Sequence, residues 1–144
     1  MTIGLDTNIL CYALDSAYRE NALCQDILLK LSSEFRVGIN PTVLHETYHT
    51  LVFSQKWDPR EAQRRLSMLL SHPCVDFYNQ TKRVCSMALE IATRHNIGGR
   101  DSLIITNFLI NRVSSLYTHD MDLLRLKEIK WKNLSLKFED PTSQ

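Results

Sequence analysis

The sequence opens with Met1-Thr-Ile-Gly-Leu-Asp6-Thr7-Asn8, an apolar run that ends in an acid, a hydroxyl and an amide. The run predicts a strand over residues 2–6. The apolar spacing that follows predicts a helix over 7–14, with Asp6 or Thr7 as its capping residue. Ligands of parallel sheets collect at the carboxyl edge of the strands. Asp6 therefore marks the edge at which a functional site is expected.

Three further acids, Glu46, Asp101 and Asp120, lie far along the chain in comparable positions. Asp120 follows the short apolar stretch 115–118, so its carboxylate meets that of Asp6 if both strands run parallel in one sheet. Glu46 and Asp101 are expected in the first turns of two helices, where backbone N–H groups and the helix dipole stabilise negative charge. The four acids are thus predicted to share one site.

The rest of the chain alternates strand and helix patterns. Apolar residues at helical spacing predict a helix over 17–33, and further helices are expected to begin at Pro41, Asp58, Thr81 and Asp101. Strands are expected at 35–40, 74–78, 115–118 and 134–138. This alternation predicts an α/β fold, a three-layer α/β/α sandwich whose central parallel sheet is covered on both faces.

Carboxylates without cysteines or a clear set of histidines favour a hard cation such as Mg²⁺ or Mn²⁺, which is suited to phosphate ester chemistry. Asn8 and Thr118 lie beside these acids and could hold their oxygens in place. We therefore predict one site in which three acids bind the metal and a fourth completes the catalytic set: Asp6, Asp101 and Asp120, with Glu46.

The length of 144 residues fits a single domain over residues 1–144, and the 44% hydrophobic content supplies a core. No signal peptide is recognisable, and no apolar run approaches the about 18 residues that a membrane span needs, so a cytoplasmic protein without a membrane partner is expected. The net charge of +1 neither proposes nor excludes a nuclease.

The cysteines form no Cys-x-x-Cys pair and stand among apolar residues at helix or strand spacing. They are expected to be small buried core residues without disulfides or zinc. The four are Cys11, Cys24, Cys74 and Cys85.

A competing hypothesis arises from His45-Glu46-Thr47-Tyr48-His49, which spells the H-E-x-x-H motif of zinc metallopeptidases. Two histidines four residues apart share one helix face and could bind Zn²⁺, with Glu46 as general base. The sequence offers no convincing third ligand, and the motif leaves the other three acids unexplained.

A second alternative is a non-catalytic module of the same fold that binds nucleic acid or protein through basic residues. Arg60, Arg64 and Arg65 cluster on one predicted helix, and a second cluster contains Lys127, Lys130 and Lys132. Such clusters are usually solvated surface. Arg100 is the stronger candidate for a phosphate contact because it borders Asp101.

The motifs resemble those of the PIN-domain nucleases, which include the VapC-type ribonuclease toxins of toxin–antitoxin pairs. The resemblance runs nearly end to end. It is carried by four motifs, namely Asp6-Thr7-Asn8, Glu46 in the helix after the second strand, Arg100-Asp101-Ser102-Leu103-Ile104, and Thr118-His119-Asp120-Met121-Asp122-Leu123. Two residues depart from the family pattern: Leu123, where an aromatic residue is frequent, and Asn107, where a small apolar residue is usual.

The resemblance implies metal-dependent cleavage of RNA at the four acids. It leaves open whether Asp120 or Asp122 binds the metal; Asp120 fits the spacing from Thr118 better, and Asp122 is expected to be auxiliary. The resemblance also implies a homodimer, for which helices with surplus apolar surface give independent support. In a toxin, an antitoxin protein would be a further partner.

Overall fold

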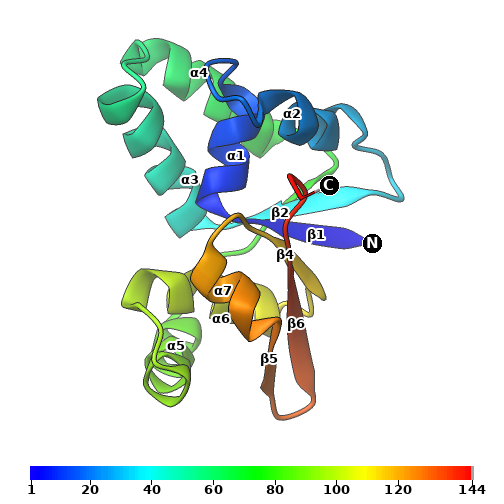
Figure 1. Ribbon diagram of the computed structural model, residues 1–144, viewed down its shortest axis with the longest axis vertical. Coiled ribbons are helices and arrows are strands. Elements are labelled where there is room, and N and C mark those ends of the chain that lie inside the picture. The colour runs from blue at the N-terminus through cyan, green and yellow to red at the C-terminus, as the bar shows by residue number, and fades with distance from the viewer. Residues whose placement is uncertain (144) are drawn as a thin grey trace.

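The computed structural model describes residues 1–143, which build a twisted six-stranded sheet in the order β3-β2-β1-β4-β6-β5. Helices α1–α4 lie on one side of the sheet and α5–α7 on the other (Figure 1). The strands are β1 (Thr2–Leu5), β2 (Arg36–Ile39), β3 (Val75–Phe77), β4 (Ser115–Tyr117), β5 (Glu128–Trp131) and β6 (Leu134–Glu139). The helices are α1 (Thr7–Leu14), α2 (Asn21–Leu29), α3 (Pro41–His49), α4 (Pro59–Ser71), α5 (Lys82–His95), α6 (Gly99–Ile110) and α7 (Met121–Leu126), and a π-helical turn, η1 (Thr50–Ser54), continues α3.

The predicted α/β fold with a mainly parallel sheet is confirmed, with one correction at the edge. Strands β3, β2, β1, β4 and β6 pair in parallel, but β5, which the sequence analysis did not predict, pairs antiparallel with β6. Along β6, residues at alternate positions are buried and exposed. At this end of the sheet, one face of β6 is therefore exposed, while the arrangement of helices flanking a mostly parallel sheet is as expected.

Helix α2 is shorter than the predicted helix over 17–33. The preceding turn is held by Asp15, whose side chain accepts a hydrogen bond from the Ala17 amide at 2.9 Å. Asn21 then donates to the Tyr12 carbonyl at 2.7 Å, so the loop folds back on the end of α1. After the helix, the Ser32 hydroxyl accepts from the amides of Glu34 and Phe35. Side-chain bonds of this kind compete with helix formation at both ends.

Two glycines of neighbouring strands make room for helix α6. Gly4 of β1 pairs with Gly38 of β2. A Cβ atom on Gly4 would lie 3.0 Å from the ring of Phe108, and one on Gly38 would lie 2.8 Å from the ring of Tyr78. Phe108 is fully buried on α6. Gly4 therefore lets Phe108 of α6 pack closely on β1, and Gly38 leaves room for the ring of Tyr78.

A buried amide network ties α6 to the loop after β3 and to α3. The side-chain nitrogen of Asn107 lies 2.9, 3.1 and 2.8 Å from the oxygens of Tyr78 (carbonyl), Asn79 (carbonyl) and Gln80 (Oε1). Its oxygen accepts from Asn40 at 3.2 Å. Asn40 is also the N-cap of α3. The departure noted at Asn107 is thus a fully hydrogen-bonded link beneath the two helices that carry Glu46 and Asp101.

The cysteine prediction is correct for two residues and wrong for two. Cys11 and Cys24 are buried, Cys74 is only partly buried and Cys85 is exposed. Cys85 follows Val84, which faces the core, so the 100° step of the helix turns the thiol outward. All four are free thiols. Among the described residues, no helix is both long and apolar enough to cross a membrane.

We expect Asn107→Leu to lower the free energy of unfolding by about 2–4 kcal/mol, because an apolar side chain of similar size leaves several buried polar groups without a partner. Equilibrium urea denaturation measures the loss. Asn111→Ala is the matched control, since this exposed residue of the same helix end makes one hydrogen bond, to the Asn107 carbonyl. Equal losses in the two variants would show that the buried network contributes little.

Candidate functional site

The carboxylate of Asp6 lies at the junction of β1 and β4. Its residue caps α1, and its Oδ1 accepts from the Thr7 amide at 2.8 Å. The Thr118 hydroxyl, just beyond β4, donates to Asp6 Oδ2 at 2.7 Å. The Asp6 amide donates to the Tyr117 carbonyl at 2.9 Å, so main chain and side chain both join the two strands. Asp6 is 6% exposed and is held in one orientation.

Glu46 reaches the same place from α3. It lies in the second turn of that helix, not in the first turn as expected from the sequence, because the helix begins at Pro41. The Thr7 hydroxyl donates to Glu46 Oε1 at 2.8 Å. Glu46 Oε2 is buried and lies 2.5 Å from Arg100 Nε, in an ion pair. Among the described residues, the exposed Arg100 is therefore the one partner of this buried carboxylate oxygen.

Asp101 and Asp120 approach from the other side of the sheet. Asp101 lies in the first turn of α6, where the glycines Gly98 and Gly99 precede it. Asp120 is the N-cap of α7, and its Oδ1 accepts from the amides of Asp122 and Leu123 at 2.8 and 3.3 Å. Helix N-termini stabilise both negative charges.

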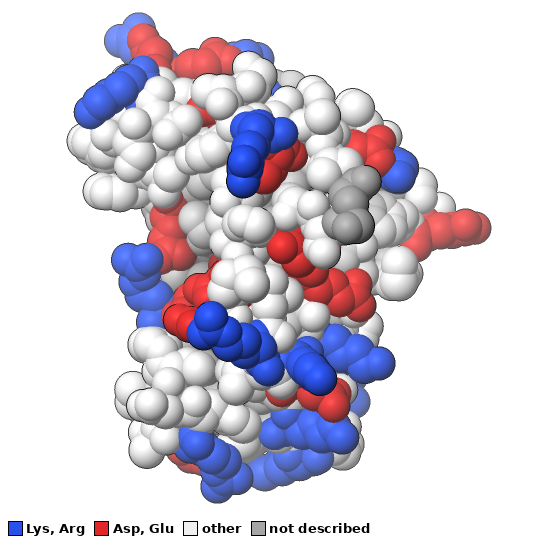
Figure 2. All heavy atoms as spheres, in the orientation of Figure 1, with Lys and Arg blue, Asp and Glu red and all other residues white. Residues whose placement is uncertain are grey.

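A cleft of about 490 Å³ brings the four acids together. Figure 2 shows acidic side chains where the part of the molecule with α1–α4 meets the part with α5–α7, and basic side chains over α7, β5 and β6. The cleft is lined by Asp6, Thr7, Asn8, Cys11, Tyr12, Tyr18, Glu46, His49, Thr50, Arg100, Asp101 and Asp120.

The crowded carboxylates raise one another's proton affinity. Burial raises the pKa of Asp6 from 3.8 to about 6; the hydrogen bonds from Thr118 and Thr7 oppose this shift, and the charges of Asp101 and Asp120 add to it. Burial also raises the pKa of Asp101, as do the charges of Asp120 and Glu46, while Arg100 acts in the opposite direction. A positive charge in the cleft would relieve this repulsion.

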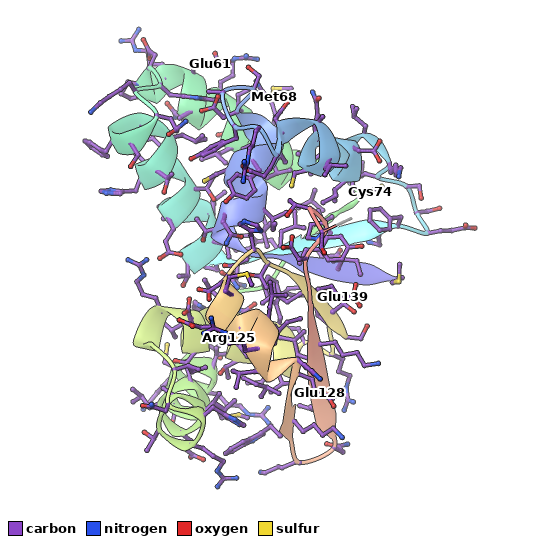
Figure 3. The ribbon with its side chains drawn as sticks, in the orientation of Figure 1. Glu61, Met68, Cys74, Arg125, Glu128 and Glu139 are labelled. Atoms are coloured by element: carbon purple, nitrogen blue, oxygen red, sulfur yellow. The ribbon has the colours of Figure 1, made fainter. Side chains whose placement is uncertain are left out.

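The predicted supporting residues occupy different places. Thr118 contacts Asp6 directly and also accepts from the Asp120 amide at 3.1 Å. Asn8 lines the cleft, and its side-chain oxygen lies 3.4 Å from the His119 amide. Asp122, by contrast, is 88% exposed and pairs with Arg125, which projects from α7 in Figure 3. The geometry thus separates Asp120 from Asp122.

Arg100, the predicted phosphate contact, is 81% exposed at the rim of the cleft and is paired with Glu46. Its charge partly offsets the four acids, and the exposed position leaves it free to exchange partners at modest cost.

Thr7 was not singled out by the sequence analysis as a site residue. Its hydroxyl reaches Glu46 across 39 positions of sequence, which no local pattern reveals. The available signal was its place directly after Asp6, at the start of the helix that packs against α3.

The H-E-x-x-H hypothesis gains no support from the geometry. His45 lines a groove with Tyr48, between α3 and α4, whereas His49 lines the carboxylate cleft and packs on Phe53 at 4.9 Å. Within residues 1–143, no three His, Cys, Asp or Glu side chains are already arranged around one point where an ion could bind.

Because no three such side chains within residues 1–143 already surround one point, the four acids of the cleft would have to adjust to share a cation. Their chemistry fits a hard divalent ion, because all are oxygen donors and Glu46 Oε2 is buried without a hydrogen bond.

The chain matches one known protein family over most of its length. The model of the PIN domain matches residues 3–129. The chain belongs to the PIN domain family. The match spans the region from β1 into β5 and includes all four acids of the cleft.

Solved structures of similar fold are consistent with this assignment. Mycobacterium tuberculosis VapC20, described as a sarcin-ricin loop cleaving toxin, superposes with a TM-score of 0.72 at 16% identity, over 86% of this chain and 94% of that one. Rickettsia felis VapBC2, bound to a DNA fragment from its promoter, gives 0.66 at 21% identity, over 97% and 100%. VapBC-1 from nontypeable Haemophilus influenzae gives 0.65 at 17%, over 99% and 100%. At these identities the likeness establishes the fold. No curated protein sequence matches this PIN domain.

We expect Asp6→Asn to stabilise the metal-free protein by about 1–3 kcal/mol at pH 7. The wild-type carboxyl binds its proton more tightly when folded, with a pKa of about 6 against 3.8, so wild-type stability falls as the pH rises through this interval. The uncharged asparagine side chain does not ionise, so the variant does not lose stability in this way. The gain should be nearly complete at pH 7 and absent below about pH 3, where Asp6 is protonated in both states.

Thermal unfolding in EDTA at about pH 7 and about pH 3 measures this difference. A variant that is no more stable than the wild type at pH 7 would contradict the inference that the buried charge is costly. Asp122→Asn is the control, because its carboxylate is exposed and should change stability little at either pH.

Proposed function

We propose that this PIN domain is a metal-dependent endoribonuclease that hydrolyses RNA phosphodiester bonds, and that it acts as the toxin of a toxin–antitoxin pair. The observation that carries the proposal is the convergence of four carboxylates, from β1, α3, α6 and the start of α7, in one cleft at the carboxyl edge of the sheet. Buried like charges are costly, and a divalent cation offsets that cost.

In this proposal Asp6, Asp101 and Asp120 hold Mg²⁺ or Mn²⁺, and Glu46 completes the catalytic set. When bound, the cation supplies an acidified water and positive charge beside the scissile phosphate. Thr118 and Asn8 keep the neighbouring groups in position, and Asp122 contributes only charge at a distance.

The residues of the chain have further tasks. The Thr7 hydroxyl orients Glu46, so that its Oε2, once Arg100 leaves it, can accept a proton or contact the metal. Arg100 is placed to release Glu46 and to contact an RNA phosphate, since the guanidinium is exposed and needs little desolvation.

RNA and the toxin role are supported by the structural neighbours. VapC20 is described as a toxin that cleaves the sarcin-ricin loop, and a further structure of similar fold is described as a toxin–antitoxin complex from Klebsiella pneumoniae. By analogy we propose an RNA substrate in the cytoplasm and an antitoxin protein as partner.

We expect Asp6→Asn and Asp101→Asn to keep the fold but to lower RNA cleavage on the order of a hundredfold or more, because each removes a charged oxygen from the site. Glu46→Gln should also be severely impaired. Asp122→Asn is the matched control on the exposed side of α7 and should lose less than Asp120→Asn. Cleavage of a mixed single-stranded RNA with Mg²⁺ or Mn²⁺, and with EDTA, gives the activities, while calorimetry gives metal affinity.

Full activity in Asp6→Asn or Asp101→Asn would refute the shared site. The variant with both His45 and His49 replaced by alanine separates this function from a zinc peptidase. It should retain most of the metal-dependent RNA cleavage. Stoichiometric zinc that is lost in this variant, together with cleavage of a peptide library, would establish the H-E-x-x-H alternative instead.

We also propose that the chain forms a homodimer. Phe53, Met68 and Leu70, from η1 and α4, are 59%, 60% and 43% exposed, and Figure 3 labels Met68 among them. Burial of such apolar surface favours association.

Light scattering at micromolar concentration should give the mass of two chains. Co-expression with the product of an adjacent small gene should give a larger complex that no longer cleaves RNA. A strictly monomeric, active particle would refute the dimer, and the absence of any such partner would refute the toxin role.

A further inference from the structure

Two tyrosines form a wall of the carboxylate cleft that the proposed chemistry does not use. Tyr12 comes from α1 and Tyr18 from the loop before α2, and both line the cleft with the four acids. Their ring centroids are 4.9 Å apart at an interplanar angle of 67°. Tyr12 also lies edge-on to the ring of His119, at 5.8 Å and 73°. Three aromatic rings thus follow one another from Tyr18 to the residue beside Asp120.

The loop that carries Tyr18 is fixed by a buried carboxylate. Asp15 is 7% exposed, and its oxygens accept hydrogen bonds from the Ala17 amide at 2.9 Å and from Gln55 and Trp57 at 3.1 Å each. The Tyr18 amide in turn donates to the Asp15 carbonyl at 3.3 Å. These contacts position the loop independently of any ligand, so the aromatic wall is preformed.

Core packing accounts for only part of this wall. Tyr12 packs against the apolar core, whereas Tyr18 is not among the described side chains that do so. Both rings are partly exposed within the cleft. A ring held at the wall of a polar cleft, away from the core, has surface available for a flat apolar ligand.

We propose that Tyr12 and Tyr18 form a stacking subsite for one unpaired nucleobase next to the cleaved phosphate. The inference rests on the proposed nuclease function and adds the recognition of a base. Four carboxylates repel a phosphate backbone, and the chain as a whole carries a charge of only +1, so affinity needs a contribution that does not depend on charge. Stacking on an aromatic ring provides it and accepts any base.

The subsite also defines the form of the substrate. A base can lie on Tyr18 only when it is unstacked from its neighbours and unpaired, as in loops, bulges and single strands. Tyr12 supports Tyr18 from the core side, because the edge of one ring meets the face of the other. Cleavage should therefore occur beside unpaired nucleotides.

The experiment combines a protein variant with a substrate variant. A short unstructured RNA, whose cleaved bond has been mapped with the wild-type protein and Mn²⁺, is prepared with an abasic nucleotide on either side of that bond. Tyr18→Ala should raise KM for the intact RNA roughly tenfold or more, with a smaller effect on kcat. Tyr18→Phe keeps a stacking ring and should restore KM to near the wild-type value.

The two changes should not be additive. On the RNA whose abasic position faces Tyr18, the wild type and Tyr18→Ala should have nearly equal KM values, because there is no base left to stack. The slope of log affinity against log salt, measured by fluorescence anisotropy, should be the same in both proteins, since no phosphate contact is lost. Tyr48→Ala, which removes a partly buried ring from the groove between α3 and α4, controls for the loss of an aromatic side chain elsewhere.

The possible failures are distinguishable. Additive effects of Tyr18→Ala and of both abasic positions, in a protein that cleaves RNA normally, would overturn the stacking subsite and leave the nuclease proposal intact. A wild-type protein that cleaves no RNA with Mg²⁺ or Mn²⁺ would overturn both. If Tyr18→Ala loses its fold, fluorescence anisotropy can instead compare the affinities of the Asp101→Asn variant for the intact and the abasic RNAs. Equal affinities would refute the subsite.

Discussion

The hydrogen bond from the Thr118 hydroxyl to the buried carboxylate of Asp6 is the contact on which the site depends. It joins the ends of β1 and β4, two strands that are neighbours in the sheet but 112 residues apart in sequence. Helix α1 begins at Asp6 and α7 begins at Asp120, whose amide also bonds to Thr118. A displacement of this pair would therefore move the start of two helices and the place where their acids meet.

The same contact has an energetic cost. A carboxylate that is 6% exposed keeps its charge at neutral pH only against a raised pKa, although two hydrogen bonds stabilise the charged form. Such a buried charge lowers the stability of the metal-free fold, but it favours the binding of a cation, because a positive charge relieves the repulsion among the carboxylates. Folding stability thus favours an uncharged group at position 6, whereas cation binding favours the charged carboxylate of Asp6.

The sequence predicted what local periodicity and strand ends determine. Asp6 and Asp120 follow strands, so their meeting could be deduced, and five of the six strands were placed. Features that depend on tertiary contacts were not predicted. Strand β5 is defined by its antiparallel pairing with β6. Helix α2 was shortened by the hydrogen bonds of Asp15 and Asn21, and the Thr7 hydroxyl meets Glu46 only after α1 packs on α3. Cys85 was misplaced because residue type was given more weight than its angle on the helix.

The Asn107 network and the carboxylate cleft show how a structural link differs from a functional site. In the Asn107 network, the side-chain nitrogen has oxygen acceptors and the side-chain oxygen has a donor, so the cost of burying the amide is compensated within the fold. In the cleft, the buried Glu46 Oε2 has only the exposed Arg100 as an ion-pair partner among the described residues, and the carboxylates around it outnumber this single arginine. A network that is complete has no need of a ligand. The cluster that retains uncompensated negative charge is the one to which we assign a cation and a substrate, and it shares its cleft with the tyrosines proposed to receive a base.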